Sequence, residues 1–338
     1  MGQAALAIVG ATVAFCAYKA LRLALADADL HLLGLGKHKR AAFEGKVVWI
    51  TGASQGLGAI LAKYFAGFGA RLILSSRDAS KLQGVKASLG LGDDRCLVLP
   101  FDLLGPYAAL EEAAKKADAA FGGAGIDYLV HNAGASQHAI AAETSSDVTD
   151  ELMQLNAIGP IKLTRAVLPL MLARDKGRLV VIGSMSSKLP SPGQAVYCAA
   201  KMALYGYFST LATELADTNV HVTICCPGPV ATGSAETPRV VYGPNGRIVQ
   251  NNTGSSNRHD PARTAELIAS AAAHGVDEAW IARHPVLAVG YIFQLVPLLG
   301  WHLLKRVGPK RARAIKEGKD AYAMKLMAGG AKGGVASS

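Results

Sequence analysis

The fold of this chain is decided by the stretch Val47-Val48-Trp49-Ile50-Thr51-Gly52-Ala53-Ser54-Gln55-Gly56-Leu57-Gly58. It begins with an apolar run rich in β-branched residues, which is typical of a buried strand. A glycine-rich turn follows and leads into the helical pattern of Ala59–Phe68. Such a turn alone could be a tight strand-to-helix connection. Its place after the first strand, with Gly-x-x-x-Gly-x-Gly spacing, predicts instead a backbone cradle for a pyrophosphate at a helix N-terminus.

Further apolar runs alternate with helical patterns downstream of this turn. They predict strands at Arg71–Ser75, Cys96–Pro100, Tyr128–His131, Leu179–Ile182 and His221–Cys225. Strand, helix and strand repeated in this way imply right-handed crossovers and a parallel sheet. The region contains no internal repeat or low-complexity linker. We therefore predict a single α/β domain over residues 46–282, built as a Rossmann-type doubly wound parallel sheet.

Charge is distributed unevenly along the 338-residue chain. Apolar residues make up 51% and charged residues 18%, which favours a large core or membrane contact over disorder. The net charge is +10, and Lys305–Ser338 alone holds nine basic and two acidic residues. Nucleic acid is one partner for such a tail, but the chain shows no recognisable nucleic-acid module. Because the basic stretches follow uncharged apolar runs, we predict membrane lipids as the partner and no nucleic acid.

The N-terminal apolar run indicates a membrane anchor. Ala4–Tyr18 carries no charge, and fifteen residues are fewer than the about 20 that a span needs. The run can extend to Leu25 if Lys19 snorkels to the interface. A cleaved signal peptide is the main alternative, but no basic residue precedes the run. We expect an uncleaved anchor at residues 1–25 and a basic linker at 26–45, with the catalytic body in the cytosol.

The C-terminal part contains a second uncharged stretch, Pro285–Leu304. Gly290, Pro297 and Gly300 interrupt it, so a clean spanning helix is not predicted. It could be a helix buried against the body or a subunit, or a segment lying at the lipid interface ahead of basic residues. We assign residues 283–327 to an apolar, then basic, membrane-associating extension and 328–338 to a disordered tail.

The end of the second predicted strand bears on the choice of nicotinamide cofactor. An NAD enzyme places a carboxylate there for the ribose hydroxyls, but this chain has Ser76 followed by Arg77. A guanidinium can pair with a 2′-phosphate through two hydrogen bonds. Asp78 complicates this reading, because it could bond the ribose or pair with Arg77. We predict NADP(H), with NAD(H) as the alternative, and Asp102 as an acceptor for the adenine amino group.

Catalytic chemistry is indicated by Tyr197 and Lys201, which lie at i and i+4 on one helical face. A phenol with a pKa of about 10 is a poor acid–base group at neutral pH, and a nearby ammonium brings that pKa toward the working range. Ser184, thirteen residues before the tyrosine, can hydrogen-bond the substrate oxygen. Asn156 is a candidate for holding an ordered water that relays protons to Lys201.

These motifs, in this order and spacing, resemble the short-chain dehydrogenase/reductase family over about residues 46–282. The resemblance implies a catalytic tetrad of Asn156, Ser184, Tyr197 and Lys201. We assign the following residues to the cofactor site: Thr51, Gly52, Ser54, Gln55, Gly56, Leu57, Gly58, Arg77, Asp102, Asn132, Ala133, Gly134, Tyr197, Lys201, Pro227, Gly228, Val230 and Thr232. Gln55 departs from the small or basic residue that the family often has there. The five cysteines show no metal-ligating spacing, so we predict no metal.

The two ends of the chain also resemble one subgroup of that family, the membrane-anchored dehydrogenase/reductase member 7 proteins. The resemblance lies in Ala26-Asp27-Ala28-Asp29-Leu30 and in His284–Lys319. It implies an enzyme of the endoplasmic reticulum membrane, expected to be a homodimer, that uses NADPH on retinoid or steroid carbonyls.

The sequence therefore predicts an NADP(H)-dependent carbonyl reductase or alcohol dehydrogenase with a lipophilic substrate. Alternatives are a 3-ketoacyl or other keto-lipid reductase and an enzyme that catalyses NAD-dependent oxidation of a hydroxysteroid. An alternative of another class is a membrane scaffold that binds dinucleotide without turnover. Gly233–Asn257, rich in Gly, Pro, Asn and Ser, is expected to be a mobile substrate lid, or else a passive surface loop.

Overall fold

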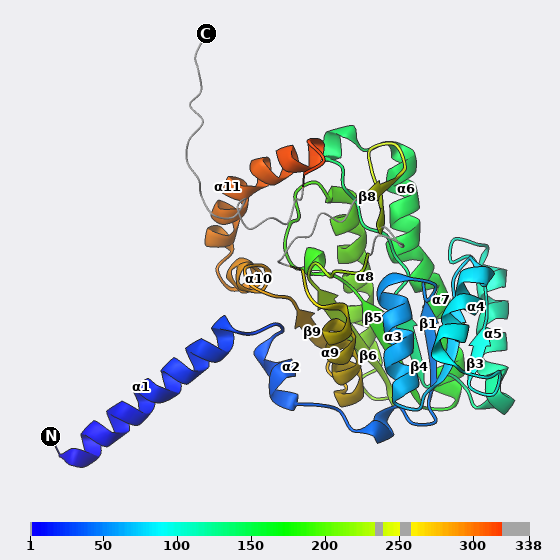
Figure 1. Ribbon diagram of the computed structural model, residues 1–338, viewed down its shortest axis with the longest axis horizontal. Coiled ribbons are helices and arrows are strands. Elements are labelled where there is room, and N and C mark those ends of the chain that lie inside the picture. The colour runs from blue at the N-terminus through cyan, green and yellow to red at the C-terminus, as the bar shows by residue number, and fades with distance from the viewer. Residues whose placement is uncertain (1, 234–238, 251–257, 320–338) are drawn as a thin grey trace, which may run out of the picture.

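The computed structural model describes residues 2–233, 239–250 and 258–319. Its body is a seven-stranded parallel sheet between two layers of helices (Figure 1). The strands are β1 (Val47–Thr51), β2 (Arg71–Ser75), β3 (Cys96–Val98), β4 (Tyr128–His131), β5 (Gly177–Ile182), β6 (Val220–Pro227) and β9 (Glu278–Ile281). Their order across the sheet is β3-β2-β1-β4-β5-β6-β9. This confirms the predicted doubly wound parallel sheet.

Strand β1 shows why the sheet lies in the middle of the molecule. All five of its residues are buried. Val48 and Ile50 pack on the side of the sheet that carries α3 (Gly56–Gly67), α4 (Ala79–Leu89) and α9 (Pro261–His274). Val47 and Trp49 pack on the opposite side, against α5 (Tyr107–Gly123), α7 (Gly159–Ala173) and α8 (Ala195–Glu214). A strand covered by helices on both faces has apolar residues at successive positions, as this one does.

The strand order reverses between β1 and β4, which are neighbours in the sheet. The crossovers after β1 and β4 run in opposite directions and leave a crevice beyond the carboxyl ends of these strands. The glycine turn follows β1, and Asn132–Gly134 follow β4. The topology therefore brings the two motifs together.

The structure contains three strands that the sequence did not predict. Strand β9 extends the sheet beyond β6, and an antiparallel hairpin forms from β7 (Arg239–Tyr242) and β8 (Arg247–Gln250). These strands have four residues each, which is too short for a distinct periodic signal. The hairpin lies inside the predicted lid, whose residues 234–238 and 251–257 fall outside the described part of the chain.

Residues 26–45 pack closely on the body, although the sequence indicates a basic linker there. They contain α2 (Leu30–Leu35) and a short 3-10 turn at Arg40–Ala42. Leu32 and Phe43 are buried in the core. Asp29 caps α2 by accepting a hydrogen bond from Leu32 N at 2.8 Å, and it also accepts one from Trp280 N of β9 at 2.7 Å. This segment ties the N-terminal helix to the edge of the sheet.

The N-terminal helix α1 (Gln3–Ala24) projects away from the body (Figure 1). Its window Ala7–Ala24 has a mean hydropathy of 1.4 and no share of it is buried. Among the described residues it is the one helix long and apolar enough to cross a membrane. It is therefore a candidate membrane anchor.

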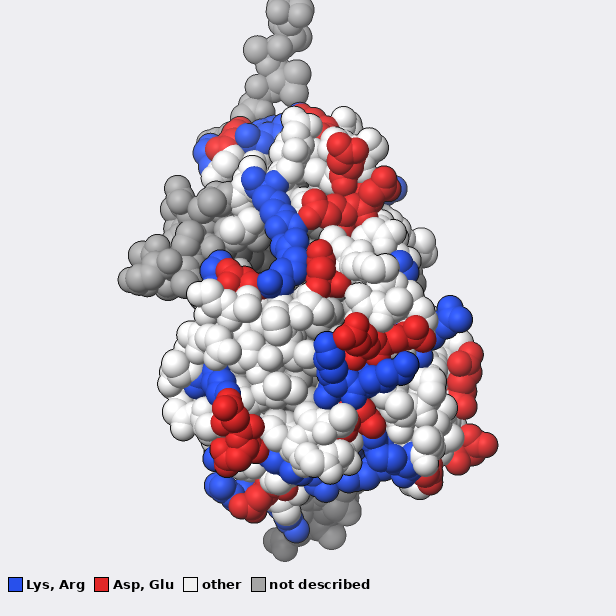
Figure 2. All heavy atoms as spheres, turned by 90° about the vertical axis from the view of Figure 1, so that its right-hand side faces the viewer, with Lys and Arg blue, Asp and Glu red and all other residues white. Residues whose placement is uncertain are grey.

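The C-terminal extension forms two helices, α10 (Val286–Leu295) and α11 (Pro297–Lys316), joined at Val296. They lie on the same side of the body as the end of α1 (Figure 1). The opposite side, which carries α4 and α5, displays Lys and Arg side chains interspersed with Asp and Glu (Figure 2).

Candidate active site

A cavity of about 860 Å³ opens at the carboxyl edge of the sheet. All the site residues predicted from the sequence line it except Gly58, which is buried in α3 next to the glycine turn. These residues come from segments as far apart as Thr51 and Thr232. The parallel sheet brings them together because each segment follows the carboxyl end of a strand.

The glycine turn forms one end of the cavity. Gly52 has a φ of +66°, and a Cβ atom there would lie 2.8 Å from Ala133 Cα. A Cβ atom on Gly58 would lie 2.2 Å from Gly52 O. Helix α3 begins at Gly56 without a side-chain cap from Gln55, so its first N–H groups can bind an anion. The turn thus has the shape and polarity of a pyrophosphate cradle, which a side chain at Gly52 or Gly58 would obstruct.

Thr51 and Asn132 hold this turn against the loop after β4. Asn132 Nδ2 donates to Thr51 O at 3.0 Å and to Gly52 O at 3.2 Å. Thr51 Oγ1 accepts from the backbone N of Asn132 and of Ala133, at 3.1 and 3.2 Å. The amide nitrogen of Asn132 is therefore used in fixing the turn, and this residue acts on the cavity mainly through the backbone that it holds.

The acidic residue after β2 is occupied locally. Asp78 caps α4 by accepting from Lys81 N at 3.0 Å, and its other oxygen pairs with Lys81 Nζ at 3.6 Å. The backbone hydrogen bond from Lys81 is the main reason why the pKa of Asp78 is lowered. Arg77 is exposed at the same end of the cavity. Asp78 therefore pairs with Lys81 and not with Arg77, which was one of the two partners that the sequence left open.

Asp102, the predicted acceptor for an adenine amino group, lies on the same wall of the cavity. Its Oδ1 accepts a hydrogen bond from Leu104 N at 3.0 Å. This bond orients the carboxylate in a local turn. The side chain is exposed, so its second oxygen remains open to a ligand.

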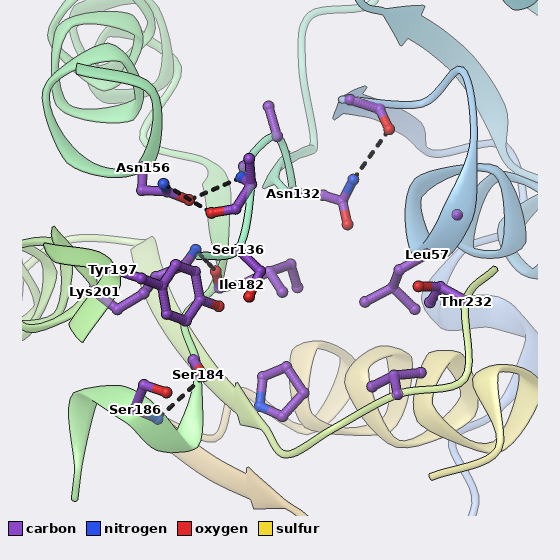
Figure 3. A pocket seen from close by; sticks show the side chains of 18 of the residues that line it. Leu57, Asn132, Ser136, Asn156, Ile182, Ser184, Ser186, Tyr197, Lys201 and Thr232 are labelled. Atoms are coloured by element: carbon purple, nitrogen blue, oxygen red, sulfur yellow. Dashed lines mark hydrogen bonds between the residues drawn. The ribbon is translucent and has the colours of Figure 1, made fainter. Parts of the chain in front are cut away.

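Tyr197 and Lys201 project from α8 at the other end of the cavity (Figure 3). Lys201 is 5% exposed and donates from Nζ to Ile182 O at 2.8 Å. Its Nζ lies 5.9 Å from the centroid of the Tyr197 ring. Burial lowers the pKa of Lys201 to about 8. Lys201 therefore carries a positive charge at neutral pH and loses its proton at a pH only slightly higher.

Asn156 lies in a single π-helical turn, Gln154–Ile158, between α6 (Ser146–Met153) and α7. Such turns inside α-helices often occur at functional sites. Its Oδ1 accepts from Ala135 N at 3.1 Å, and its Nδ2 donates to Ala135 O and Leu152 O, each at 3.1 Å. A Cβ atom on Gly134 would lie 2.6 Å from Asn156 Oδ1 and 3.6 Å from Lys201 Nζ. Gly134 thus lets Asn156 and Lys201 approach the same backbone segment.

Ser184 follows β5 and faces Tyr197 (Figure 3). Its Oγ accepts a hydrogen bond from Ser186 N at 3.1 Å. That bond uses a lone pair, so the hydroxyl proton can still be donated. Ser187 Oγ donates to Ser184 O at 2.5 Å, which closes the short 3-10 turn Met185–Ser187. The turn fixes a hydroxyl donor beside the phenol.

Sequence reasoning missed Gln137, which holds the first turn of α8. It is fully buried, and its Oε1 accepts from Val196 N at 3.0 Å and from Tyr197 N at 3.1 Å. These are N–H groups of the first turn of α8, which have no partner inside the helix. Gln137 follows the Asn-Ala-Gly motif by three residues, which is the one sequence signal that could have indicated it.

Sequence reasoning also missed the wall opposite the tetrad. Residues of α10 and α11 line the cavity. Leu189, and Val240 from the hairpin strand β7, line it as well. The residues from the two helices are Val286, Val289, Leu304, Val307, Gly308 and Arg311. Arg311 Nη2 donates to Gln194 Oε1 at 2.8 Å, so α11 contacts the loop that precedes Tyr197. The C-terminal extension is part of the site.

The fold and the cavity together define a nucleotide-binding α/β protein with a Tyr–Lys pair. The short chain dehydrogenase family model matches residues 46–239. The chain belongs to the short-chain dehydrogenase/reductase family, whose members are oxidoreductases of CH–OH and C=O groups. This confirms the class of enzyme that the motifs indicate.

Curated relatives extend this similarity beyond residues 46–239. The chain is 36% identical over 309 residues to the human "Dehydrogenase/reductase SDR family member 7", covering 89% of this chain and 90% of the relative. It is 32% identical over 290 residues to the bovine "Dehydrogenase/reductase SDR family member 7B", covering 84% and 86%. The predicted resemblance to the member 7 subgroup is confirmed.

Solved structures agree with the fold. A short-chain dehydrogenase from Streptomyces avermitilis superimposes with a TM-score of 0.64 at 26% identity, covering 80% of this chain and 98% of that one. A metagenomic short-chain oxidoreductase in complex with NADP gives a TM-score of 0.57 at 27% identity, covering 72% and 98%.

Proposed function

We propose that this protein is an NADP(H)-dependent carbonyl reductase and alcohol dehydrogenase that acts on a lipophilic substrate. The observation that carries the proposal is a single cavity that holds the glycine cradle at one end and Tyr197, Lys201 and Ser184 at the other. The nicotinamide group, when bound, supplies or accepts the hydride. The protein supplies orientation, a proton at a defined atom and the exclusion of water.

Each tetrad residue has a role that its contacts support. Tyr197 Oη donates the proton to a carbonyl oxygen and takes it back in the oxidation direction. The charge of Lys201 favours the phenolate form of Tyr197. Ser184 donates its free hydroxyl proton to the same substrate oxygen. Asn156 supports the proton path toward Lys201 by holding Ala135 and the π-helical turn in place.

The preference for NADP(H) rests on the end of β2. Asp78 is committed to the cap of α4 and to Lys81, so its carboxylate is poorly placed to select the ribose hydroxyls of NAD. Arg77 and Lys81 both line that end of the cavity and offer positive charge to a 2′-phosphate. The similar metagenomic oxidoreductase was solved with NADP. NAD(H) is the alternative cofactor.

A lipophilic substrate is supported by the apolar side chains that α10 and α11 contribute and by the candidate anchor α1. A retinoid or steroid carbonyl is the substrate class that we favour, with a keto-lipid as the alternative. We further propose the endoplasmic reticulum membrane as the location, with the catalytic body in the cytosol, and a homodimer as the assembly.

The test is an NADPH-consumption screen of the purified full-length protein against retinal, ketosteroids and ketoacyl lipids. Tyr197→Phe removes only the phenol oxygen, so it should lower kcat at least about 100-fold and leave NADPH binding largely unchanged. Turnover retained in Tyr197→Phe would overturn the catalytic assignment. NADPH binding without turnover of any carbonyl by the wild-type protein would favour the scaffold alternative.

A further inference from the structure

The bend between α10 and α11 presents large apolar side chains to solvent. We call it the apolar elbow and define it as Leu295, Val296, Leu298, Leu299 and Trp301. Leu298 is 87% exposed and Leu295 is 76% exposed. Clusters of this kind on a protein surface mark contact with a membrane, a partner protein or a ligand.

The elbow is held as a compact unit. Gly300 is buried at the crossing of the two helices, where a Cβ atom would lie 2.7 Å from Phe293 Cα. The rings of Phe293 and Trp301 lie 5.4 Å apart in an edge-to-face arrangement. The outward direction of Leu298 and Leu299 therefore follows from the packing of α10 on α11.

The elbow lies close to the end of the candidate anchor. His284 Nε2 is hydrogen-bonded to Leu23 O at 2.7 Å, so the last turn of α1 contacts a residue two positions before the start of α10. Helix α10 has ten residues and is therefore about 15 Å long. If α1 crosses a bilayer, the elbow lies on the order of 20 Å from the point where that helix leaves the lipid.

Charge around the elbow favours lipid over a protein partner. Lys305, Arg306 and Lys310 are exposed on α11 just after the elbow. Apolar side chains followed by exposed cations are typical of helices at the interface of an anionic bilayer. Trp301 occupies the position between the two, which tryptophan prefers at membrane surfaces.

The inner faces of the same helices line the active-site cavity. Val286 and Val289 reach it from α10, and Leu304 and Val307 reach it from α11. The same two helices thus carry the apolar elbow at their junction and apolar side chains that line the cavity.

We propose that the apolar elbow inserts into the bilayer interface as a membrane contact distinct from α1. This contact holds α10 and α11, which line the cavity, against the membrane surface. The substrate then enters the cavity from the bilayer. The membrane contact stands independently of the reaction, whereas the entry route rests on the proposed function.

The membrane contact is tested with the full-length protein reconstituted in vesicles of phosphatidylcholine and phosphatidylserine. Lipids brominated on the acyl chains quench tryptophans that lie in the interface. Of the three tryptophans, Trp49 is fully buried in the core and Trp280 is half-buried. We expect quenching that disappears in Trp301→Phe. Equal quenching in the wild type and in Trp301→Phe would overturn the contact.

A second copy of the chain is the other occupant to consider. Leu298→Cys would then form a disulfide between copies under mild oxidation in the vesicles, and bromolipid quenching of Trp301 would be absent. That result would replace the bilayer with a dimer contact and overturn the proposal.

The entry route is tested with Leu298→Glu/Leu299→Glu, which places charge on the elbow outside the cavity. We expect KM for a vesicle-dissolved carbonyl to rise about tenfold. KM for NADPH and kcat/KM for a water-soluble carbonyl should stay unchanged. The matched control is Leu172→Glu, an exposed leucine on α7, which should leave all three values unchanged.

The outcomes separate this proposal from the proposed function. An unchanged KM for the vesicle-dissolved substrate in the double variant would refute the entry route while the enzyme remained active. Absence of carbonyl reduction in every assay would refute the proposed function, and the quenching of Trp301 would still decide the membrane contact.

Discussion

The two ends of the cavity are built in different ways. The cofactor end uses two short segments, Thr51–Gly58 and Asn132–Gly134, which lie at the ends of β1 and β4. The side-chain amide of Asn132 joins them by donating to the backbone carbonyls of Thr51 and Gly52. The substrate end uses Val240 from the β7–β8 hairpin and side chains of α10 and α11, which are separated from the tetrad by about a hundred residues. The first end consists mostly of backbone and the second mostly of apolar side chains.

This difference shows how one fold can keep its cofactor and change its substrate. A backbone cradle tolerates few substitutions, because a Cβ atom at Gly52 or Gly58 would collide with neighbouring backbone. A wall of apolar side chains on terminal helices can change in size without disturbing the sheet. Substitutions at one end of the cavity should therefore leave the function of the other end unchanged.

The largest expected effect concerns Lys201, which lies at the end of the cavity opposite the glycine turn. Burial lowers its pKa to about 8, from the 10.5 of a lysine in water. Between these pH values the unfolded chain binds more protons than the folded one, so the free energy of unfolding rises with pH through this lysine. The rise should reach at most about 3 kcal/mol. It is measured as the difference between the wild type and Lys201→Met in denaturant titrations from pH 8 to 10.5. If the free energy of unfolding changes with pH in the same way in both proteins, folding does not lower the pKa of Lys201.

The second prediction breaks the cofactor end alone. Gly58→Ala places a methyl group against Gly52 O, and overpacking of this kind costs about 2 kcal/mol. NADPH binding, measured by calorimetry, should weaken about 30-fold. The matched control is Gly67→Ala in the same helix, where a Cβ atom meets nothing within 4 Å. An equal loss of binding in both variants would mean that the cradle does not depend on close approach at Gly58.

The third prediction sharpens the description of the cofactor end. Arg77→Ala should raise KM for NADPH about tenfold and leave KM for NADH nearly unchanged, because only the former carries the 2′-phosphate. Steady-state kinetics with both cofactors measure the ratio. Lys63→Ala, at an exposed position on α3, serves as the control for a general loss of positive charge. A similar change in both KM values for Arg77→Ala would refute a role in choosing the cofactor.

The smallest expected effect belongs to the substrate end. Val307→Ala removes two methyl groups from the wall that α11 contributes, which corresponds to about 1 kcal/mol. The value of kcat/KM for a lipophilic carbonyl should fall about fivefold, with KM for NADPH unchanged. A rise in KM for NADPH instead would show that the two ends are coupled through α11.

Much of the sheet and of the candidate site could be predicted from the sequence. The alternation of strands and helices, the glycine turn and the Tyr197–Lys201 pair are patterns of neighbouring residues, and each carries its own spacing. The predicted parallel sheet is confirmed. Asp78 shows the limit of this reasoning, because a carboxylate within reach of a ribose or an arginine in the sequence is instead used in capping α4.

The sequence by itself determined the sheet, its nucleotide-binding edge and the side chains of the tetrad, because local periodicity and turn chemistry are written in consecutive residues. Only the tertiary structure decided that Gln137 caps the catalytic helix, that residues 26–45 pack into the core and that α10 and α11 wall the cavity. These features depend on hydrogen bonds and packing between segments far apart in the chain. Such contacts leave no periodic pattern in either segment, so they become visible only when the chain is folded.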